Sequence, residues 1–221
     1  MKKRKIVLIH TSPAAIAPLM RFYNEAAPEL EITNLLDDGL LRLLAAGEHR
    51  SVERRLAEML TVAVRTYEAE LVMVTCSSVT KGMVERLAPL FDLPVLKIDY
   101  PMAREAVAEG RRRIGVAATF PPTLVPTSQL ISEAAEEAGA SIEIIREVVP
   151  EAYDALLSGD EEAHDELLCA GVERLAAKRV DVIVLAQISM ARVLPRLEGK
   201  LGVPLLSSLH TSLGAIRSAL K

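Results

Sequence analysis

Several functional classes are disfavoured by what this sequence of 221 residues lacks. It has neither a GxGxxG motif nor a GxxxxGK[ST] motif, so we do not expect binding of a dinucleotide or of a nucleoside triphosphate. It has no HExxH motif and no cysteines and histidines at metal-ligand spacing, so we expect no metal site and no cofactor. It also lacks a basic stripe and carries a net charge of -4, which argues against a nucleic-acid partner.

Long hydrophobic runs and a set of paired cysteines are also missing. No run reaches the roughly 18–20 apolar residues of a membrane span, so we expect no membrane association. The apolar part of the first ten residues, MKKRKIVLIH, is too short for a signal peptide. The two cysteines, Cys76 and Cys169, make no disulfide framework. We therefore expect a reduced, cytoplasmic protein, in which Cys169 fills an apolar helix face.

The sequence does contain a regular alternation of short apolar runs, which predict strands, with segments of helical periodicity. The predicted strands are Lys5–His10, Glu31–Leu36, Leu71–Thr75, Leu93–Asp99, Arg113–Thr119, Ala140–Val148, Asp181–Ala186 and Val203–Ser208. Predicted helices begin at Pro13, Asp37 and Thr211, and others cover Ser51–Tyr67, Thr80–Leu90, Pro101–Glu109, Val125–Ala138 and Glu161–Lys178. This alternation predicts an α/β fold with parallel sheets covered by helices.

The order of predicted elements repeats after about 110 residues, as a duplicated block should. The pairs that superpose are Ile6 with Ile114, Cys76 with Gln187, and Leu93 with Val203, at separations of 108, 111 and 110 residues. We predict two pseudo-symmetric lobes, 1–105 and 106–221, each a mainly parallel four-stranded sheet flanked by helices. The sequence leaves open whether the C-terminal helix packs on the second lobe or back on the first.

Ligands of open α/β sheets bind outside the carboxyl ends of the strands. The loops at those ends are His10–Pro13, Thr75–Thr80, Thr119–Thr123 and Ala186–Met190. We expect these four loops to converge on one cleft between the lobes.

Cys76 is the candidate catalytic residue, in the stretch LVMVTCSSVTK. A thiol where a strand gives way to a helix lies among unpaired backbone N–H groups, and these favour the reactive thiolate. The alternative is a small buried apolar residue that ends a strand. Three hydroxyls adjoin the thiol in TCSS, and a packed core has little use for them, so we favour the reactive thiol.

Hydroxyl and amide side chains in the four loops are candidates for binding a substrate carboxylate or a developing enolate oxygen. Their alternative role is helix capping or local loop hydrogen bonding. The candidates are Thr11, Ser12, Ser77, Ser78, Thr80, Thr119, Gln187 and Ser189, with Thr123 as a weaker one. An uncharged amide such as that of Gln187 cannot act as a base.

Two of the four histidines follow strands. His10 ends the first strand and is a candidate substrate-binding residue, and His210 follows the last strand. Each could supply charge or a proton near neutral pH, although a lone histidine is more often structural. His49 and His164 lie in charged helical surroundings and are expected to be inert.

Taken together, these residues resemble the aspartate/glutamate racemase superfamily, which includes glutamate, aspartate and hydantoin racemases, maleate isomerase and arylmalonate decarboxylase. TCSS resembles the Cys-Asn-Thr-type motif of the first lobe, and AQISMAR occupies the place of the Gly-Cys-Thr-type motif of the second. The resemblance implies a homodimer and cofactor-independent chemistry. In that chemistry one cysteine removes the α-proton of a carboxylate and another returns a proton to the opposite face.

The sequence departs from this pattern at Gln187, where the second cysteine is missing. The resemblance still implies cysteine-dependent proton transfer at the α-carbon of a small carboxylate or amino acid. Two alternatives stay open: a single-cysteine decarboxylase of the arylmalonate type, and a non-catalytic carboxylate-binding protein. Arylmalonate decarboxylase also has one cysteine, but in its second lobe. Lys97, Arg104 and Arg192 lie near the loops and could pair with a second carboxylate.

Overall fold

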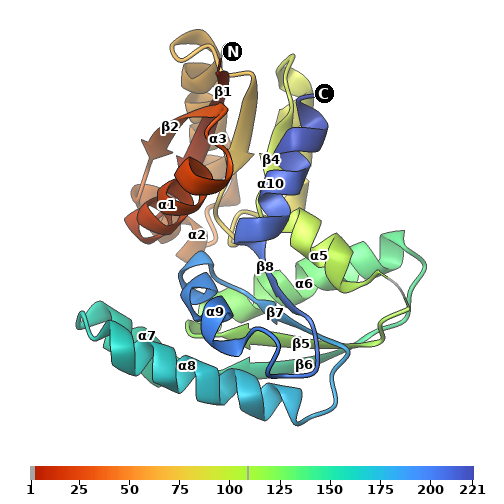
Figure 1. Cartoon of the computed structure of the whole chain (residues 1–221). Coiled ribbons are helices and arrows are strands. Elements are labelled where there is room, and N and C mark those ends of the chain that lie inside the picture. The colour runs from red at the N-terminus through yellow and green to blue at the C-terminus, as the bar shows by residue number, and fades with distance from the viewer. Residues whose placement is uncertain (1–2, 109) are drawn as a thin grey trace. The chain divides into compact units, whose positions relative to one another are not determined.

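The computed structural model describes residues 3–108 and 110–221, and Figure 1 shows two sheets with helices packed on them. Each sheet has four strands, and every pairing is parallel. The chain forms two compact units, one of residues 1–98 with 212–221 and one of residues 99–211. The predicted α/β class with two four-stranded parallel sheets is confirmed.

The first unit contains the sheet β2-β1-β3-β4. Its strands are β1 (Arg4–His10), β2 (Leu30–Leu36), β3 (Leu71–Val74) and β4 (Val95–Lys97). Its helical elements are η1 (Pro13–Ala15), α1 (Ile16–Ala26), α2 (Gly39–Ala45), α3 (His49–Arg65), α4 (Lys81–Leu87) and η2 (Ala88–Leu90). All four residues of β3 are buried, as its continuous run of apolar residues predicts.

Helices cover the first sheet because each has one apolar face. The long helix α3 buries Val52, Leu56, Leu60 and Ala63, which lie three or four residues apart and join the core formed with β1 and β3. The chain's last residues, 212–221, belong to this unit and include most of α10 (Ser208–Ala219).

One hydrogen bond of α10 within the first unit is fully buried. The Tyr23 hydroxyl on α1 lies 2.6 Å from Ser212 Oγ. Burial raises the pKa of Tyr23 to about 12, so the phenol stays protonated.

The second unit contains the sheet β6-β5-β7-β8. Its strands are β5 (Arg113–Ala118), β6 (Glu143–Val148), β7 (Val182–Leu185) and β8 (Leu205–Ser207). Its helical elements are α5 (Tyr100–Ala106), α6 (Pro121–Glu137), α7 (Pro150–Leu157), α8 (Glu161–Ala176), η3 (Ile188–Val193), α9 (Leu194–Leu197) and the first turn of α10.

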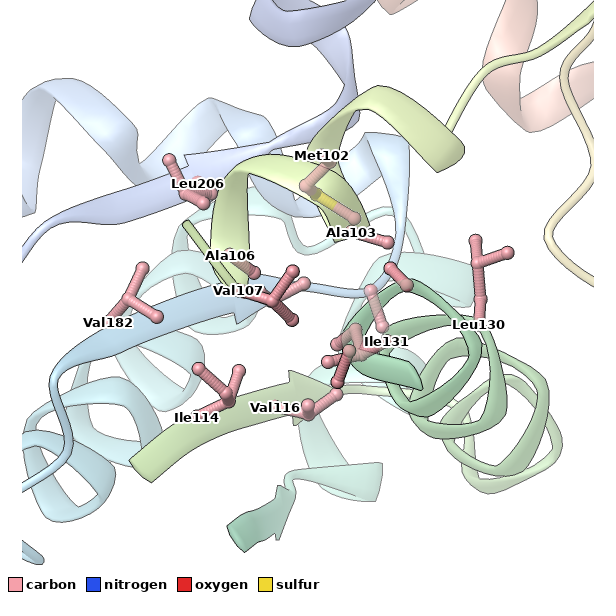
Figure 2. Packing of buried hydrophobic residues seen from close by; sticks show 14 of the residues in the cluster. Met102, Ala103, Ala106, Val107, Ile114, Val116, Leu130, Ile131, Val182 and Leu206 are labelled. Carbon is pink, nitrogen blue, oxygen red and sulfur yellow. The ribbon is translucent and has the colours of Figure 1, made fainter. Parts of the chain in front are cut away.

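Two separate apolar clusters cover the two faces of the second sheet. On one face, α5 and α6 pack against alternate residues of β5 and β7, as Figure 2 shows for Ile114, Val116 and Val182. On the other face, α7 and α8 pack against the residues that point the opposite way. Helix α8 lies so close to the chain after β6 that a Cβ on Gly171 would come within 2.3 Å of Val149 Cγ2.

Helix α5 explains why the two units divide after residue 98 rather than at the predicted 105/106 boundary. Met102, Ala103 and Ala106 of α5 are almost fully buried in the cluster that covers the second sheet. The helix therefore belongs with the second unit, although it follows the last strand of the first.

The internal duplication is visible in the strand order and in the hydrogen bonds. Both sheets place the first strand of the repeat between the second and the third. Thr75 N donates to Ile9 O at 3.0 Å, and the equivalent Ala186 N donates to Ala117 O at 2.9 Å. Cys76 and Gln187 each lie two residues after the last residue of their strand, so the two side chains occupy equivalent places.

A few elements differ from the sequence prediction. Helix α7 was not predicted, because it is short and fully buries only Ala152. Helix α6 begins at Pro121, so Thr123 lies in its first turn rather than in a loop. The predicted end of the fifth helix at Glu109 lies outside the described residues. In the described part of the chain, no helix combines the length and apolar character needed to cross a membrane.

Candidate active site

The Cys76 turn connects β3 to α4 at the carboxyl end of the first sheet. Val79 N donates to Cys76 O at 3.3 Å and closes the turn. Thr80 Oγ1 accepts from Met83 N at 3.3 Å and caps α4. Thr80 thus performs the capping role that was its alternative, whereas Ser77 and Ser78 are half-buried between the thiol and the cap.

Cys76 exposes 9% of its surface, and its side chain packs in the apolar cluster of the first unit. Val79 and Met83 belong to the same cluster. The surroundings of the thiol are therefore mixed: hydrocarbon on the core side, and the two serines along the chain. Apolar surroundings by themselves disfavour a thiolate, so the polar and charged groups of the turn have to favour it.

Lys97 adds a positive charge to this turn. It is the last residue of β4, paired with Val74 of β3, and it is 6% exposed. Its Nζ lies 3.5 Å from Ser77 O, on the residue that follows the cysteine. A neighbouring ammonium group favours the thiolate form of a cysteine. The sequence indicated Lys97 only as a nearby cation; the strand register places it.

His10 does not lie where a substrate could bind its ring. The residue is fully buried. Its Nε2 lies 2.8 Å from Asn34 Oδ1 on β2, and its Nδ1 lies 2.8 Å from Thr75 Oγ1. Both ring nitrogens are thus engaged within the protein. Burial lowers the pKa of His10, and the hydrogen bond to Asn34 opposes this effect.

Thr11 and Ser12 follow β1, the strand next to β3. Thr11 is buried. Ser12 is half-buried, and its Oγ accepts from Ala14 N at 3.3 Å as the cap of η1. Ser12 therefore performs the capping role that was its alternative.

In the second unit, Gln187 and Thr119 are brought into direct contact. Gln187 Oε1 accepts three hydrogen bonds: from Thr119 N at 2.7 Å, from Thr119 Oγ1 at 3.1 Å and from Phe120 N at 3.2 Å. Phe120 is the residue before α6, so these donors lie at the start of that helix. Phe120 stacks on Tyr153 of α7 with ring centroids 4.8 Å apart. A glutamine oxygen thus occupies a group of donors that would suit an anion.

The turn after Gln187 is held by ion pairs to α8. Arg192 on η3 binds buried Asp165 at 2.6 Å and Glu161 at 2.8 Å, and the bond to Glu161 is the main reason that the pKa of Arg192 is raised. His164 is itself buried, with Nδ1 2.9 Å from Asp165 Oδ1. Arg192, which the sequence offered as a carboxylate partner, is therefore engaged within its own unit.

The remaining candidates occupy less informative places. Ser189 on η3 is half-buried, and His210 in the first turn of α10 is exposed. Cys169 is half-buried beside the apolar cluster between α8 and the second sheet, and burial raises the pKa of its thiol. Among the described residues, no three histidine, cysteine or acidic side chains come together as a metal site would require.

Residues 34–215, which is more than half of the chain, match the Asp/Glu/Hydantoin racemase family. The chain belongs to this family. No match is found among curated proteins.

Solved structures with the same fold include racemases and a decarboxylase. Glutamate racemase isoform RacE1 from Bacillus anthracis has a TM-score of 0.72 and 16% identity, covering 100% of this chain and 82% of that one. An aspartate racemase homologue from Pyrococcus horikoshii has a TM-score of 0.74 and 15% identity, covering 100% of both chains. Arylmalonate decarboxylase has a TM-score of 0.62 and 16% identity, covering 98% and 92%. At these identities the likeness shows the fold alone.

Proposed function

We propose that the chain is a cofactor-independent enzyme of this racemase family, which uses Cys76 to transfer a proton at the α-carbon of a small carboxylate. The observation that carries the proposal is the difference between two equivalent places in the duplicated fold. One holds a thiol in a turn whose Ser77 carbonyl lies 3.5 Å from the buried ammonium group of Lys97, and the other holds an amide whose oxygen is already bonded. Of these two groups, only the thiol can exchange a proton near neutral pH.

In this mechanism Cys76 acts as the general base in its thiolate form and as the general acid once protonated. The Lys97 ammonium stabilises the thiolate, and Ser77 and Ser78 donate hydrogen bonds to the substrate carboxylate. As the α-proton moves to sulfur, negative charge grows on the carboxylate oxygens, and the same donors stabilise it. Because Gln187 cannot accept or return a proton, the proton comes back from the same side, so exchange with retention of configuration should exceed inversion.

A proton-exchange assay tests this proposal. The wild type is incubated in heavy water with a panel of small carboxylates and amino acids, and α-deuteration is followed by NMR while chiral chromatography measures inversion. Cys76→Ser should lower the exchange rate by about 10²–10⁴-fold, the usual contribution of a general acid–base group. Cys169→Ser is the matched control and should retain exchange. Wild-type exchange that survives Cys76→Ser would remove Cys76 from the mechanism.

Decarboxylation is the second candidate, and the single thiol favours it. Loss of carbon dioxide leaves a carbanion that needs one proton from one side, so one acid group is sufficient. The same panel should then include carboxylates with two carboxyl groups on one carbon. Release of carbon dioxide with formation of one enantiomer would favour this reaction. A panel with neither exchange nor release would instead favour the carboxylate-binding alternative.

A further inference from the structure

Three side chains at the carboxyl ends of β2, β1 and β3 form a chain of hydrogen bonds that ends beside Cys76. Asn34 Oδ1 lies 2.8 Å from His10 Nε2, and His10 Nδ1 lies 2.8 Å from Thr75 Oγ1. Thr75 Oγ1 also lies 3.1 Å from Ile9 O. Thr75 is the residue before Cys76, so this series of hydrogen bonds ends next to the turn that bears the thiol.

The partners fix which nitrogen of His10 carries the proton. Asn34 Nδ2 points to Met20 Sδ at 3.3 Å, which leaves the amide oxygen to accept from His10. Nε2 must therefore be the N–H of the neutral ring. Nδ1 is then an acceptor, and the Thr75 hydroxyl donates to it. In this state the single hydroxyl proton is directed away from the Ile9 carbonyl.

The same heavy-atom arrangement also satisfies the protonated ring. When Nδ1 gains a proton it donates to Thr75 Oγ1, and the hydroxyl turns to donate to Ile9 O. Protonation of His10 therefore turns the Thr75 hydroxyl from the ring nitrogen to the Ile9 carbonyl. In both states every polar atom of the Asn34–His10–Thr75 series keeps a hydrogen-bond partner. Because burial lowers the pKa of His10, the neutral state prevails at neutral pH and the protonated state forms below the usual histidine range.

The groups that face His10 from neighbouring elements are uncharged: Asn34 from β2, Thr75 from the loop after β3, and Met20 of α1 behind Asn34. The titratable residue next in sequence to Thr75 is Cys76. The nearby cation is Lys97 of β4, at the Ser77 carbonyl.

The nearest carboxylate along β2 is also engaged. Asp37, which follows β2, binds Arg55 Nε at 2.6 Å and accepts from Gly39 N at 3.1 Å. Among the described residues, the partners of the His10 ring are the uncharged Asn34 and Thr75, so a proton on His10 would add a charge without an acidic partner.

The duplicated second unit shows that the fold does not need this arrangement. The residues equivalent to His10 and Thr75 are Ala118 and Ala186, as the matching strand registers and loop hydrogen bonds show. Asn34 is replaced by Arg146, which instead donates to Ser128 Oγ at 3.2 Å. Among the described residues, this series of polar contacts lies in the unit that carries Cys76, and the equivalent positions of the second unit do not reproduce it.

We propose that His10 is a positioning residue which, through the Thr75 hydroxyl, makes the reactivity of the Cys76 thiol depend on the protonation state of the imidazole. This inference rests on Cys76 as the reactive thiol of the proposed function. A protonated His10 adds a positive charge on a ring that contacts Thr75, the residue before the cysteine, and this charge favours the thiolate of Cys76. Alkylation of Cys76 should therefore be faster in mildly acidic solution than it would be for the same thiol without this imidazole.

The first test needs no substitution. Nitrogen-15 NMR of the histidine side chains distinguishes the two neutral tautomers. His10 should show the Nε2–H tautomer at neutral pH, and it should titrate below the usual histidine range. An Nδ1–H tautomer would overturn the proposal, because the Thr75 hydroxyl could then not donate to the ring.

The second test follows the rate of Cys76 alkylation by iodoacetamide as a function of pH in a Cys169→Ser background. The wild-type profile should have two steps, and His10→Asn should lose the lower one. Below that step the wild type should react about tenfold faster than His10→Asn, the size of effect expected of a neighbouring unit charge at an effective dielectric constant of about 20. The matched control, His49→Asn, removes an exposed histidine of the same unit and should keep both steps.

Substitutions at Thr75 separate the hydroxyl's role from simple packing. Thr75→Ser keeps the hydroxyl and should keep the lower step, whereas Thr75→Val should lose or shift it. Identical profiles for the wild type, His10→Asn and Thr75→Val would overturn the proposal. This outcome is independent of the proton-exchange assay, so failure of the proposed function and failure of this inference can be told apart.

Discussion

Replacing Gln187 tests whether its amide oxygen holds the start of α6. In Gln187→Leu, a side chain of similar size removes the acceptor of three hydrogen bonds and leaves no room for water. The Thr119 hydroxyl can rotate to a new partner and the Phe120 N–H is at an exposed residue, but Thr119 itself is fully buried. A buried donor left unbonded costs about 1–3 kcal/mol, and each lost hydrogen bond about 1 kcal/mol. We therefore expect a loss of about 2–4 kcal/mol.

Two further substitutions at this position sharpen the test. Gln187→Ala leaves space for a water molecule that can bond the same donors, so its cost should be smaller, about 1–2 kcal/mol. In Gln187→Glu a carboxylate accepts the same three bonds at the start of α6, a helix of 17 residues. This variant should match or exceed the wild-type stability at neutral pH, because a carboxylate is favoured at a helix N-terminus. Its advantage should disappear as the pH falls and the carboxylate is protonated.

Urea unfolding at neutral pH measures these differences as shifts of the midpoint at constant m-value. The control is Gln129→Leu, an exposed residue of α6 whose amide donates to Glu133, and it should change stability by less than about 0.5 kcal/mol. A Gln187→Leu variant no less stable than this control would refute the argument that the amide oxygen holds the loop.

Two other predictions concern packing and pH. Gly171→Ala should destabilise the protein by about 1–3 kcal/mol because its Cβ would overlap Val149, whereas Gly214→Ala on α10 meets nothing within 4 Å and should be neutral or stabilising in thermal unfolding. The pKa of His10 is lower in the folded than in the unfolded chain, so the unfolded chain binds more protons in mild acid. The free energy of unfolding should therefore decrease as the pH falls below about 6.5, by at most about 1.4 kcal/mol per pH unit. Urea titrations should show this decrease for the wild type in acid and a smaller one for His10→Asn.

The part of the fold that depends on local pattern could be predicted from the sequence. Buried parallel strands are continuous apolar runs, so β1, β3, β5 and β7 stand out against the amphipathic helices around them. The spacing of these strands indicates the duplication. The duplication in turn makes Cys76 and Gln187 equivalent without any information on contacts. Short elements with little buried surface, such as α7, have a weak pattern and were missed.

The sequence by itself determined the duplicated α/β architecture and the asymmetry of a thiol against an amide, because both follow from the order of residues along the chain. The tertiary structure alone decided what surrounds those two groups. Lys97 reaches the Cys76 turn, His10 is sealed between Asn34 and Thr75, and the Gln187 oxygen meets the start of α6 only because parallel strands align their carboxyl ends in a particular register. Such contacts join residues that are 20 to 68 positions apart, and no local pattern in the sequence encodes them.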